Sequence, residues 1–430
     1  MFATGVLETS SIIKKIVFMT AYSNLLKTAD QPDSAYSWWR LAISLGLSTI
    51  GGVGLWSVVV VLPTIQEEFG VDRGDASLPY MATMIGFAIG GVYMGRLADK
   101  KGVYVPLIFS AVMMCIGYIA AGYATSLWQF IIAQALFIGM LGSSASFAPL
   151  VADVTHWFMK RRGVAIAVVA SGNYLSGTIW PPLLTYGIEH YGWRQSYMAI
   201  GVICLVTMLP LALLLRRRPN LEVTATNGNG NSERFRLNLS PRALQTILVV
   251  AGIACCVAMS MPQVHIVAYC GDLGYGVARG AEMLSLMLGF GIISRLVSGM
   301  IGDKIGGVGT LILGSVLQCL ALLFYIPFDG LTSLYIVSAF FGLAQGGIVP
   351  SYALIVREYL PAKEAGARVS LVLMATVVGM ALGGWMSGEI YDLTGSYKAA
   401  FLNGIAWNLI NMSIAVWLLI GQFKSRRQTA

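Results

Sequence analysis

Long hydrophobic stretches without a charged residue recur along most of the chain. The stretch 42–62, for example, holds no Asp, Glu, Lys or Arg. A helix needs about 20 mainly apolar residues to cross the roughly 30 Å hydrocarbon core of a bilayer. The pattern therefore predicts twelve membrane-spanning helices, near 41–66, 77–98, 102–123, 127–153, 163–188, 195–215, 243–270, 280–302, 307–328, 331–357, 366–390 and 397–422.

The composition supports a membrane protein with lipid as its main solvent. Hydrophobic residues make up 57% of the 430, charged residues 11%, and the mean hydropathy is +0.73. The net charge of +8 comes without a basic stripe on any polar segment, so we expect no nucleic-acid partner. Lys and Arg instead cluster on one side of the predicted spans, 22 against 4. By the positive-inside rule, we expect a multi-pass cell (inner) membrane protein with both termini cytoplasmic.

The polar segments predict the division of the chain. The longest polar connection, 216–242, is rich in Arg, Asn and Gly and is expected to link two halves of six spans each, 41–215 and 243–423. The remaining segments, 1–40 and 424–430, are expected to be cytoplasmic tails. We expect a monomer.

An internal repeat supports two similar halves. The segment GRLADKKG at Gly95–Gly102 recurs as GMIGDKIG at Gly299–Gly306, 204 positions later, and Gly192 recurs as Gly395 after 203. Parallel repeats of six spans are typical of transporters in which two halves rock about a central site. The predicted fold is therefore an all-α membrane protein with two pseudo-symmetric six-helix halves.

At these residues the chain resembles the major facilitator superfamily, whose loop between spans 2 and 3 carries the pattern Gly95-x-x-x-Asp99-x-x-Gly102. The resemblance covers about 41–423 and implies the major facilitator fold. It also implies gating roles for Gly95, Asp99, Gly102 and Asp303, which would latch one conformation rather than bind a solute. A solvated turn is the alternative for the two aspartates.

Three further features resemble the branch that holds the monocarboxylate transporters and the oxalate-formate exchanger. They are the segment WFMKRRG at 157–163, the pattern Ala170-x-Gly172 and Arg295, which stands eight residues before Asp303. The resemblance implies transport of a small organic anion. The cations that the branch places in spans 1 and 11 are absent from 57–61 and 374–377, which favours a monoanion, hence a monocarboxylate.

Arg295 is the residue that points most directly to chemistry. It lies about seven residues inside predicted span 8, about 10 Å deep at 1.5 Å per residue. A central Arg costs about 2.5–3.5 kcal/mol to insert, yet no predicted span holds an Asp or Glu at that depth. Its repeat equivalent is Gly91. We predict that Arg295 binds the carboxylate of the solute in a bidentate manner. The alternatives are snorkelling to the interface or capping of backbone carbonyls.

Other polar side chains within spans are weaker candidates. His265, the only histidine inside a predicted span, is a candidate for proton coupling, with a hydrogen-bonded packing role as the alternative. A set of polar and aromatic residues at mid-span could line a cavity or could instead make contacts between helices. They are Asn173, Tyr174, Trp180, Gln345 and Tyr352, and also Trp56 and Gln134.

The sequence predicts a secondary active transporter, by symport or antiport, rather than an enzyme or a sensor. It holds no nucleophile–base arrangement, no metal-ligand cluster and no phosphate-binding glycine loop, so we expect no catalytic residue, cofactor or metal. A membrane sensor would carry a larger soluble segment. The alternative within transport is a carrier of a neutral or aromatic compound, by vitamin uptake or drug efflux.

Overall fold

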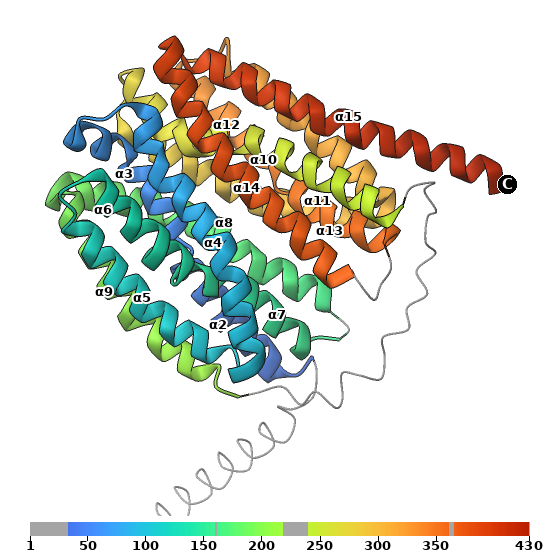
Figure 1. The fold of residues 1–430 in the computed structure, drawn as a ribbon, viewed down its shortest axis with the longest axis horizontal. Helices are drawn as coiled ribbons and strands as arrows, with labels where there is room; N and C mark the ends of the chain where they lie inside the picture. The colour runs from blue at the N-terminus through green and yellow to red at the C-terminus, as the bar shows by residue number, and fades with distance from the viewer. Residues whose placement is uncertain (1–32, 160, 218–239, 361–364, 430) are drawn as a thin grey trace, which may run out of the picture.

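The computed structural model describes residues 33–429 apart from 160, 218–239 and 361–364. Within these residues the chain is helical and contains no strand (Figure 1). Residues 1–32 of the predicted tail 1–40 and residues 218–239 of the predicted linker lie outside them. The elements are α2 (Ala35–Gly51), α3 (Val53–Phe69), α4 (Arg73–Lys101), α5 (Tyr104–Gly122), α6 (Leu127–Ile132), η1 (Ala133–Met140), η2 (Ser143–Ser146), α7 (Ala148–Trp157), α8 (Arg162–Tyr191), α9 (Trp193–Leu214), α10 (Pro241–Asp272), α11 (Val277–Tyr325), α12 (Leu331–Gln345), α13 (Ile348–Tyr359), α14 (Ala365–Thr394) and α15 (Tyr397–Thr429).

These elements make twelve crossings, which confirms the predicted fold class. Eleven helical segments are long and apolar enough to span a bilayer. One of them, α11, has 49 residues and would be about 74 Å long if straight, more than twice the bilayer core. Gly306 divides it, because its φ of 77° and ψ of 173° are not helical. The N–H of Gly307 then donates to the Glu358 carboxylate at 3.0 and 3.2 Å, which caps the second span.

Glycines with positive φ mark matching turns in the two halves. Gly102 (φ 86°) and Gly306 (φ 77°) follow the second span of each half, and Gly192 (φ 79°) and Gly395 (φ 65°) precede the last. A side chain is strained at these angles, so glycine is required there. The sequence offset of 203–204 is therefore a structural repeat as well. Gly102, one of the predicted gating residues, is therefore also needed for the backbone conformation of this turn.

Spans 4 and 10 are both broken at equivalent glycines. Span 4 passes from a π-type segment, η1, to the 3₁₀ turn η2 around Gly142, and span 10 breaks between α12 and α13 at Gly346. Backbone groups freed inside a membrane protein need partners. The Gly142 carbonyl accepts from the Ser110 hydroxyl at 2.7 Å, and the Gly346 carbonyl accepts from Arg295 Nε at 3.5 Å.

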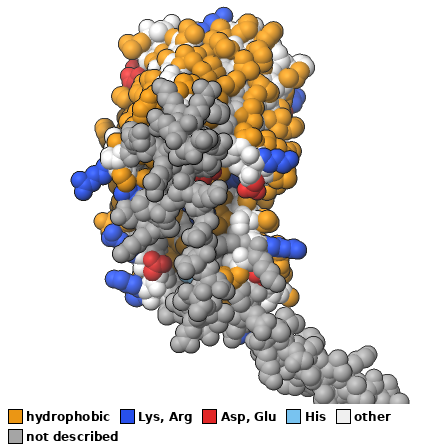
Figure 2. Space-filling model, turned by 90° about the vertical axis from the view of Figure 1, so that its right-hand side faces the viewer, with side chains coloured by type: hydrophobic (Ala, Val, Ile, Leu, Met, Phe, Trp, Pro, Cys, Tyr) orange, Lys and Arg blue, Asp and Glu red, His pale blue; other side chains and the backbone are white. Residues whose placement is uncertain are grey.

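The helices form an N half (α2–α9) and a C half (α10–α15), drawn from blue to green and from yellow to red in Figure 1. We call the end where α9 stops at Leu214 and α10 starts at Pro241 the linker face, and the opposite end, where α3 stops at Phe69, the far face. Large apolar side chains cover much of the outside, such as Val206 (64% exposed) and Ile336 (66%). Figure 2 shows hydrophobic side chains over much of the described surface in view, with most of the Lys and Arg side chains at its margins. Such a surface is suited to lipid.

A buried ion pair lies inside the N half near the linker face. Arg40 donates to both carboxylate oxygens of Asp153 at 2.7 and 2.8 Å, and the two side chains are 1% and 8% exposed. Arg40 also stacks over Trp157, with its guanidinium carbon 4.7 Å from the ring centroid. The predicted tail, 1–40, included Arg40. In the structure α2 begins at Ala35, so Arg40 lies on this helix inside the bundle.

Candidate functional site

A cavity of about 140 Å³ lies between the two halves. Side chains of α3, α4 and α8 line it from the N half, and those of α10, α11, α13 and α14 from the C half. Its aromatic residues are Trp56, Phe87, Phe147 and Tyr174, its methionines are Met84, Met259 and Met380, and its polar residues are Asn173, Gln263, Arg295 and Thr376. Apolar walls with a few polar groups are typical of small-molecule sites.

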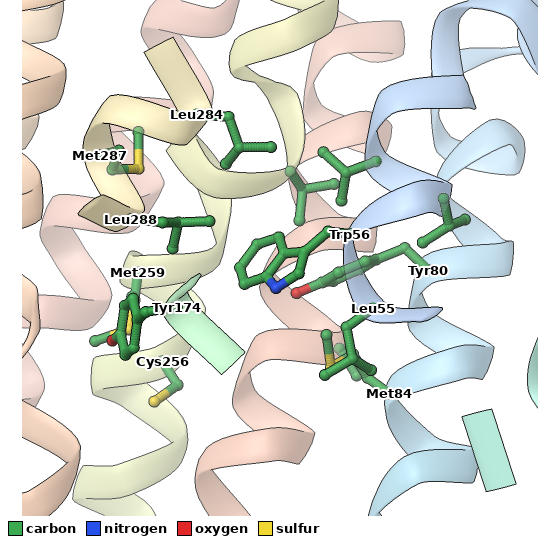
Figure 3. Close-up of a cluster of buried hydrophobic side chains, with 14 of the residues drawn as sticks. Leu55, Trp56, Tyr80, Met84, Tyr174, Cys256, Met259, Leu284, Met287 and Leu288 are labelled. Carbon is green, nitrogen blue, oxygen red and sulfur yellow. The ribbon is translucent and has the colours of Figure 1, made fainter. Parts of the chain in front are cut away.

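Trp56 stands at the centre of the apolar cluster that borders this cavity (Figure 3). Its neighbours there are Tyr80 and Met84 of α4 on one side and Leu288 and Met259 of the C half on the other. Its indole N–H donates to the Asn173 carbonyl at 3.0 Å and to Asn173 Oδ1 at 3.2 Å. The side-chain NH2 group of Asn173 donates no hydrogen bond to any described residue.

Arg295 is the charged side chain of this cavity, and it reaches across from the C half to the N half. Its Nη1 donates to the Ala170 carbonyl at 2.8 Å, and its guanidinium carbon lies 4.3 Å from the centroid of the Tyr174 ring. In the described part of the chain it has no carboxylate partner, and its Nη2 makes no hydrogen bond. One terminal nitrogen is therefore free for an anionic ligand.

The break in span 10 helps to explain how a cation is held here. Gly346 follows the last residue of α12, so its carbonyl lies at the partly negative end of a helix dipole. Arg295 combines two of the roles that the sequence left open, because it lines the cavity and also caps backbone carbonyls. The half-buried side chain points toward the other half rather than snorkelling to the linker face.

Four of the predicted cavity residues lie elsewhere. Gln134 donates to the Tyr197 hydroxyl at 3.0 Å inside the N half. Trp180 donates to the Thr49 carbonyl at 3.1 Å and borders a separate groove between α8 and α9. Tyr352 is fully buried and donates to Asn411 Oδ1 at 2.7 Å inside the C half. Gln345 accepts from Gln263 at 2.5 Å and lies one side chain behind the cavity wall. Asn173, Tyr174, Arg295 and Trp56 are the predicted residues that the structure brings together.

The predicted gating residues lie at the linker face, near the end of the second span of each half. Asp99 and Asp303 are exposed, and neither makes a hydrogen bond or ion pair among the described residues. Asp99 borders a cavity of about 310 Å³ that also contains Arg40 and Asp153. A Cβ placed on Gly95 would meet no atom within 4 Å. Among the residues described at this face, no hydrogen bond or ion pair of Asp99 or Asp303 forms a latch, and the gating roles stay a prediction.

His265 lies away from the cavity, fully buried near the far face. Its Nε2 is 2.7 Å from the Gly384 carbonyl, and its Nδ1 is 3.3 Å from the Tyr397 hydroxyl. Sequence reasoning overlooked the cluster around it, which is centred on Arg73, because Arg73 was counted among the loop charges. The Arg73 side chain is 7% exposed. A charged residue that begins a helix and directly follows a short turn was the available signal.

Comparisons with known proteins agree with the fold. Residues 41–333 and 283–430 match the sequence profile of the Major Facilitator Superfamily. The chain is 25% identical over 398 residues to Monocarboxylate transporter 13 of Bos taurus, which covers 91% of each chain. It is 22% identical over 383 residues to the Agnestins efflux protein AgnL12 of Paecilomyces divaricatus, covering 88% of this chain and 86% of that one.

Solved transporter structures share the architecture. A bacterial homologue of the human lysosomal transporter Spinster, in an inward-facing and unoccupied conformation, superposes with a TM-score of 0.63 at 14% identity, covering 92% of this chain and 98% of that chain. A POT family transporter in complex with 5-aminolevulinic acid gives 0.67 at 13% identity, with 90% and 96% covered. At these identities the likeness concerns the fold.

Proposed function

Because the chain belongs to the major facilitator superfamily, we propose that it is a secondary active transporter of a small organic anion, a monocarboxylate, that works by alternating access of its two halves. The observation that carries this proposal is Arg295 in the cavity between the halves, with a free Nη2 and no carboxylate partner in the described part of the chain. A cation held by carbonyl oxygens keeps its full charge, so an anionic ligand supplies the missing counter-charge. The name of the Bos taurus relative supports a monocarboxylate.

The remaining lining favours a solute with an apolar body. Trp56, Phe87 and Phe147 provide flat surfaces, and the methionines beside them adapt to irregular shapes. The same lining favours the second candidate function, transport of a neutral aromatic compound, which the efflux protein among the relatives also supports.

A panel of labelled solutes separates the two functions. We expect purified protein in proteoliposomes to accumulate aliphatic or aromatic monocarboxylates, and the corresponding amides, which lack the charge but keep the body, to be poor substrates. Protein-free liposomes correct for passive entry of the protonated acids. If the amides are transported as well as the acids, the neutral-compound function replaces the anion function.

We further propose that the linker face is cytoplasmic, since 22 of the Lys and Arg residues flank the spans on that side against 4 on the other. A cysteine introduced at Asn229 in the predicted linker should react with an impermeant maleimide only after cells are opened. A cysteine at Tyr123, which is 71% exposed at the far face, should react on intact cells. The reverse labelling pattern would contradict the orientation.

A further inference from the structure

At the far face one arginine of the N half is inserted among side chains of the C half. Arg73 begins α4, and its guanidinium donates to both oxygens of Asp272 at 3.1 Å and to the Tyr397 hydroxyl. The backbone N–H groups of Arg73 and Gly74 donate to Asp392 at 3.0 and 2.6 Å. Charge-assisted hydrogen bonds therefore join the halves at this face, whereas Asp99 and the linker face show no such bonds among the described residues.

The internal repeat shows how this contact differs from its counterpart. The positions equivalent to Asp272 and Tyr397 are Glu68 and Arg194, which lie 204 and 203 residues earlier. Glu68 and Arg194 pair with each other at 2.5 Å, inside the N half. In the C half a tyrosine occupies the place of that arginine, and Asp272 takes its cation from α4 of the other half. An ion pair that is internal in one half has become a bond between halves.

His265 lies directly behind this contact. The donor and the acceptor of each hydrogen bond that links Arg73 to His265 follow from the chemistry of the groups. Arg73 can only donate, so the Tyr397 oxygen accepts from it. The Gly384 carbonyl can only accept, so His265 Nε2 carries a hydrogen and donates to it. The neutral ring then has its lone pair on Nδ1, and the Tyr397 hydroxyl donates to that atom. The chain Arg73 to Tyr397 to His265 to Gly384 is complete only while His265 is neutral.

A second proton on His265 disrupts this chain. Nδ1 would become a donor and point its hydrogen at the Tyr397 oxygen, so the tyrosine hydrogen would lose its acceptor in a buried place. A second cation would also stand beside the Arg73 guanidinium. Both effects weaken the bonds that Arg73 makes across the halves.

The charged and polar side chains around His265 come from several helices. Arg73 of α4 and Asp392 of α14 interact with it electrostatically, and Tyr397 comes from α15. Asp272 lies further along α10 itself, and Glu389 of α14 is engaged with Trp385.

Two more helices pack against α10 at this end. From α3, the uncharged Gln66 accepts from Arg73 at 2.5 Å, and from α11, Glu282 is paired with Arg279. Histidine is the side chain in this cluster whose usual pKa, about 6.5, lies within the physiological range.

We propose that this cluster is a proton-operated gate, in which a proton from the far side binds Nδ1 of His265 and releases Arg73 from Asp272 and Asp392, so that the far face opens. His265 is fully buried when the gate is closed, so the proton enters during a transient opening and then holds that state. The gate rests on the proposed function only in requiring that the far face opens during the cycle.

Distances across the far face test the gate without any solute. Tyr123 of the N half and Leu393 of the C half are 71% and 84% exposed, and the native cysteines are buried or half-buried, so spin labels attach selectively to cysteines introduced at these two sites. In lipid nanodiscs, double electron–electron resonance should show a short distance at pH 8 and a growing longer population toward pH 5.5. One titrating group changes the ratio of the two by up to about tenfold per pH unit.

Variants assign the response to its residues. His265→Gln keeps a donor for Gly384 but takes up no proton, so the distance should no longer depend on pH. Tyr397→Phe should likewise remove the dependence of the distance on pH. Arg73→Gln should give the long distance at both pH values. His190→Gln, at an exposed histidine of the same face, is the matched control and should respond like the parent.

Two outcomes would overturn the gate: an unchanged distance in the parent between pH 8 and 5.5, or a full response in His265→Gln. A failed solute panel with an intact pH response would instead count against the proposed function alone.

Discussion

Arg295→Ala is expected to abolish uptake of monocarboxylates while leaving the protein folded in the membrane. Loss of one partner of a desolvated, hydrogen-bonded charge pair costs about 2–5 kcal/mol, which corresponds to a fall in uptake at low solute concentration of about thirtyfold or more. The stability should change little, because the carbonyls of Ala170 and Gly346 lose a donor but the cost of placing an arginine in the membrane disappears. Uptake, expression and monodispersity need to be measured on the same preparation.

Two companion variants make this result specific. Arg295→Lys keeps the charge and loses the planar fork, so weak uptake should remain. Arg279→Ala removes an exposed arginine that pairs with Glu282 at 2.9 Å on the same helix, and it should transport like the parent. Uptake by Arg295→Ala at the parental rate would show that the arginine serves only to cap the backbone.

Arg40→Ala and Asp153→Ala are each expected to destabilise the protein by about 3–5 kcal/mol, because each leaves its former partner buried and uncompensated. Thermal unfolding in detergent should show a clear loss for either variant. The double variant Arg40→Met/Asp153→Leu should recover most of that loss, since no lone charge is left behind.

The exposed pair Glu68 and Arg194 provides the matched comparison. Their side chains are 34% and 35% exposed, and pairs of this kind contribute about 0–1 kcal/mol. Glu68→Ala should therefore shift thermal unfolding much less than Asp153→Ala. Equal shifts for the two would contradict the importance of burial for the Arg40 pair.

The depth of residues along their helices was predictable from the sequence. Hydropathy located the crossings, the repeat at Gly102 and Gly306 located matching turns, and the depth of Arg295 together with the lack of acidic residues nearby pointed to a cavity cation. These conclusions depend only on positions along the chain and on the cost of charge in lipid.

The direction in which a side chain points around its helix axis was not predictable in the same way. Trp180, Gln345 and Tyr352 have the right depth, but their helices turn them toward neighbours inside one half or toward a separate groove. Arg40 and Arg73 were counted as loop charges because hydropathy places helix ends only within a few residues. Their partners, Asp153 and Asp272, lie more than 100 residues away, so tertiary structure alone brings each pair together.

The paired left-handed glycines indicate that the two halves descend from the duplication of one six-helix ancestor. Gly70 and Gly274 add a third matching pair, with φ of 62° and 80° and an offset of 204. Features that both copies share were inherited with the scaffold, whereas features of one copy reflect a change in one of the halves after it doubled. Arg295, opposite Gly91, and Arg73, opposite Val277, belong to the second kind. Divergence between the copies therefore separates this carrier's own specialisation from its architecture.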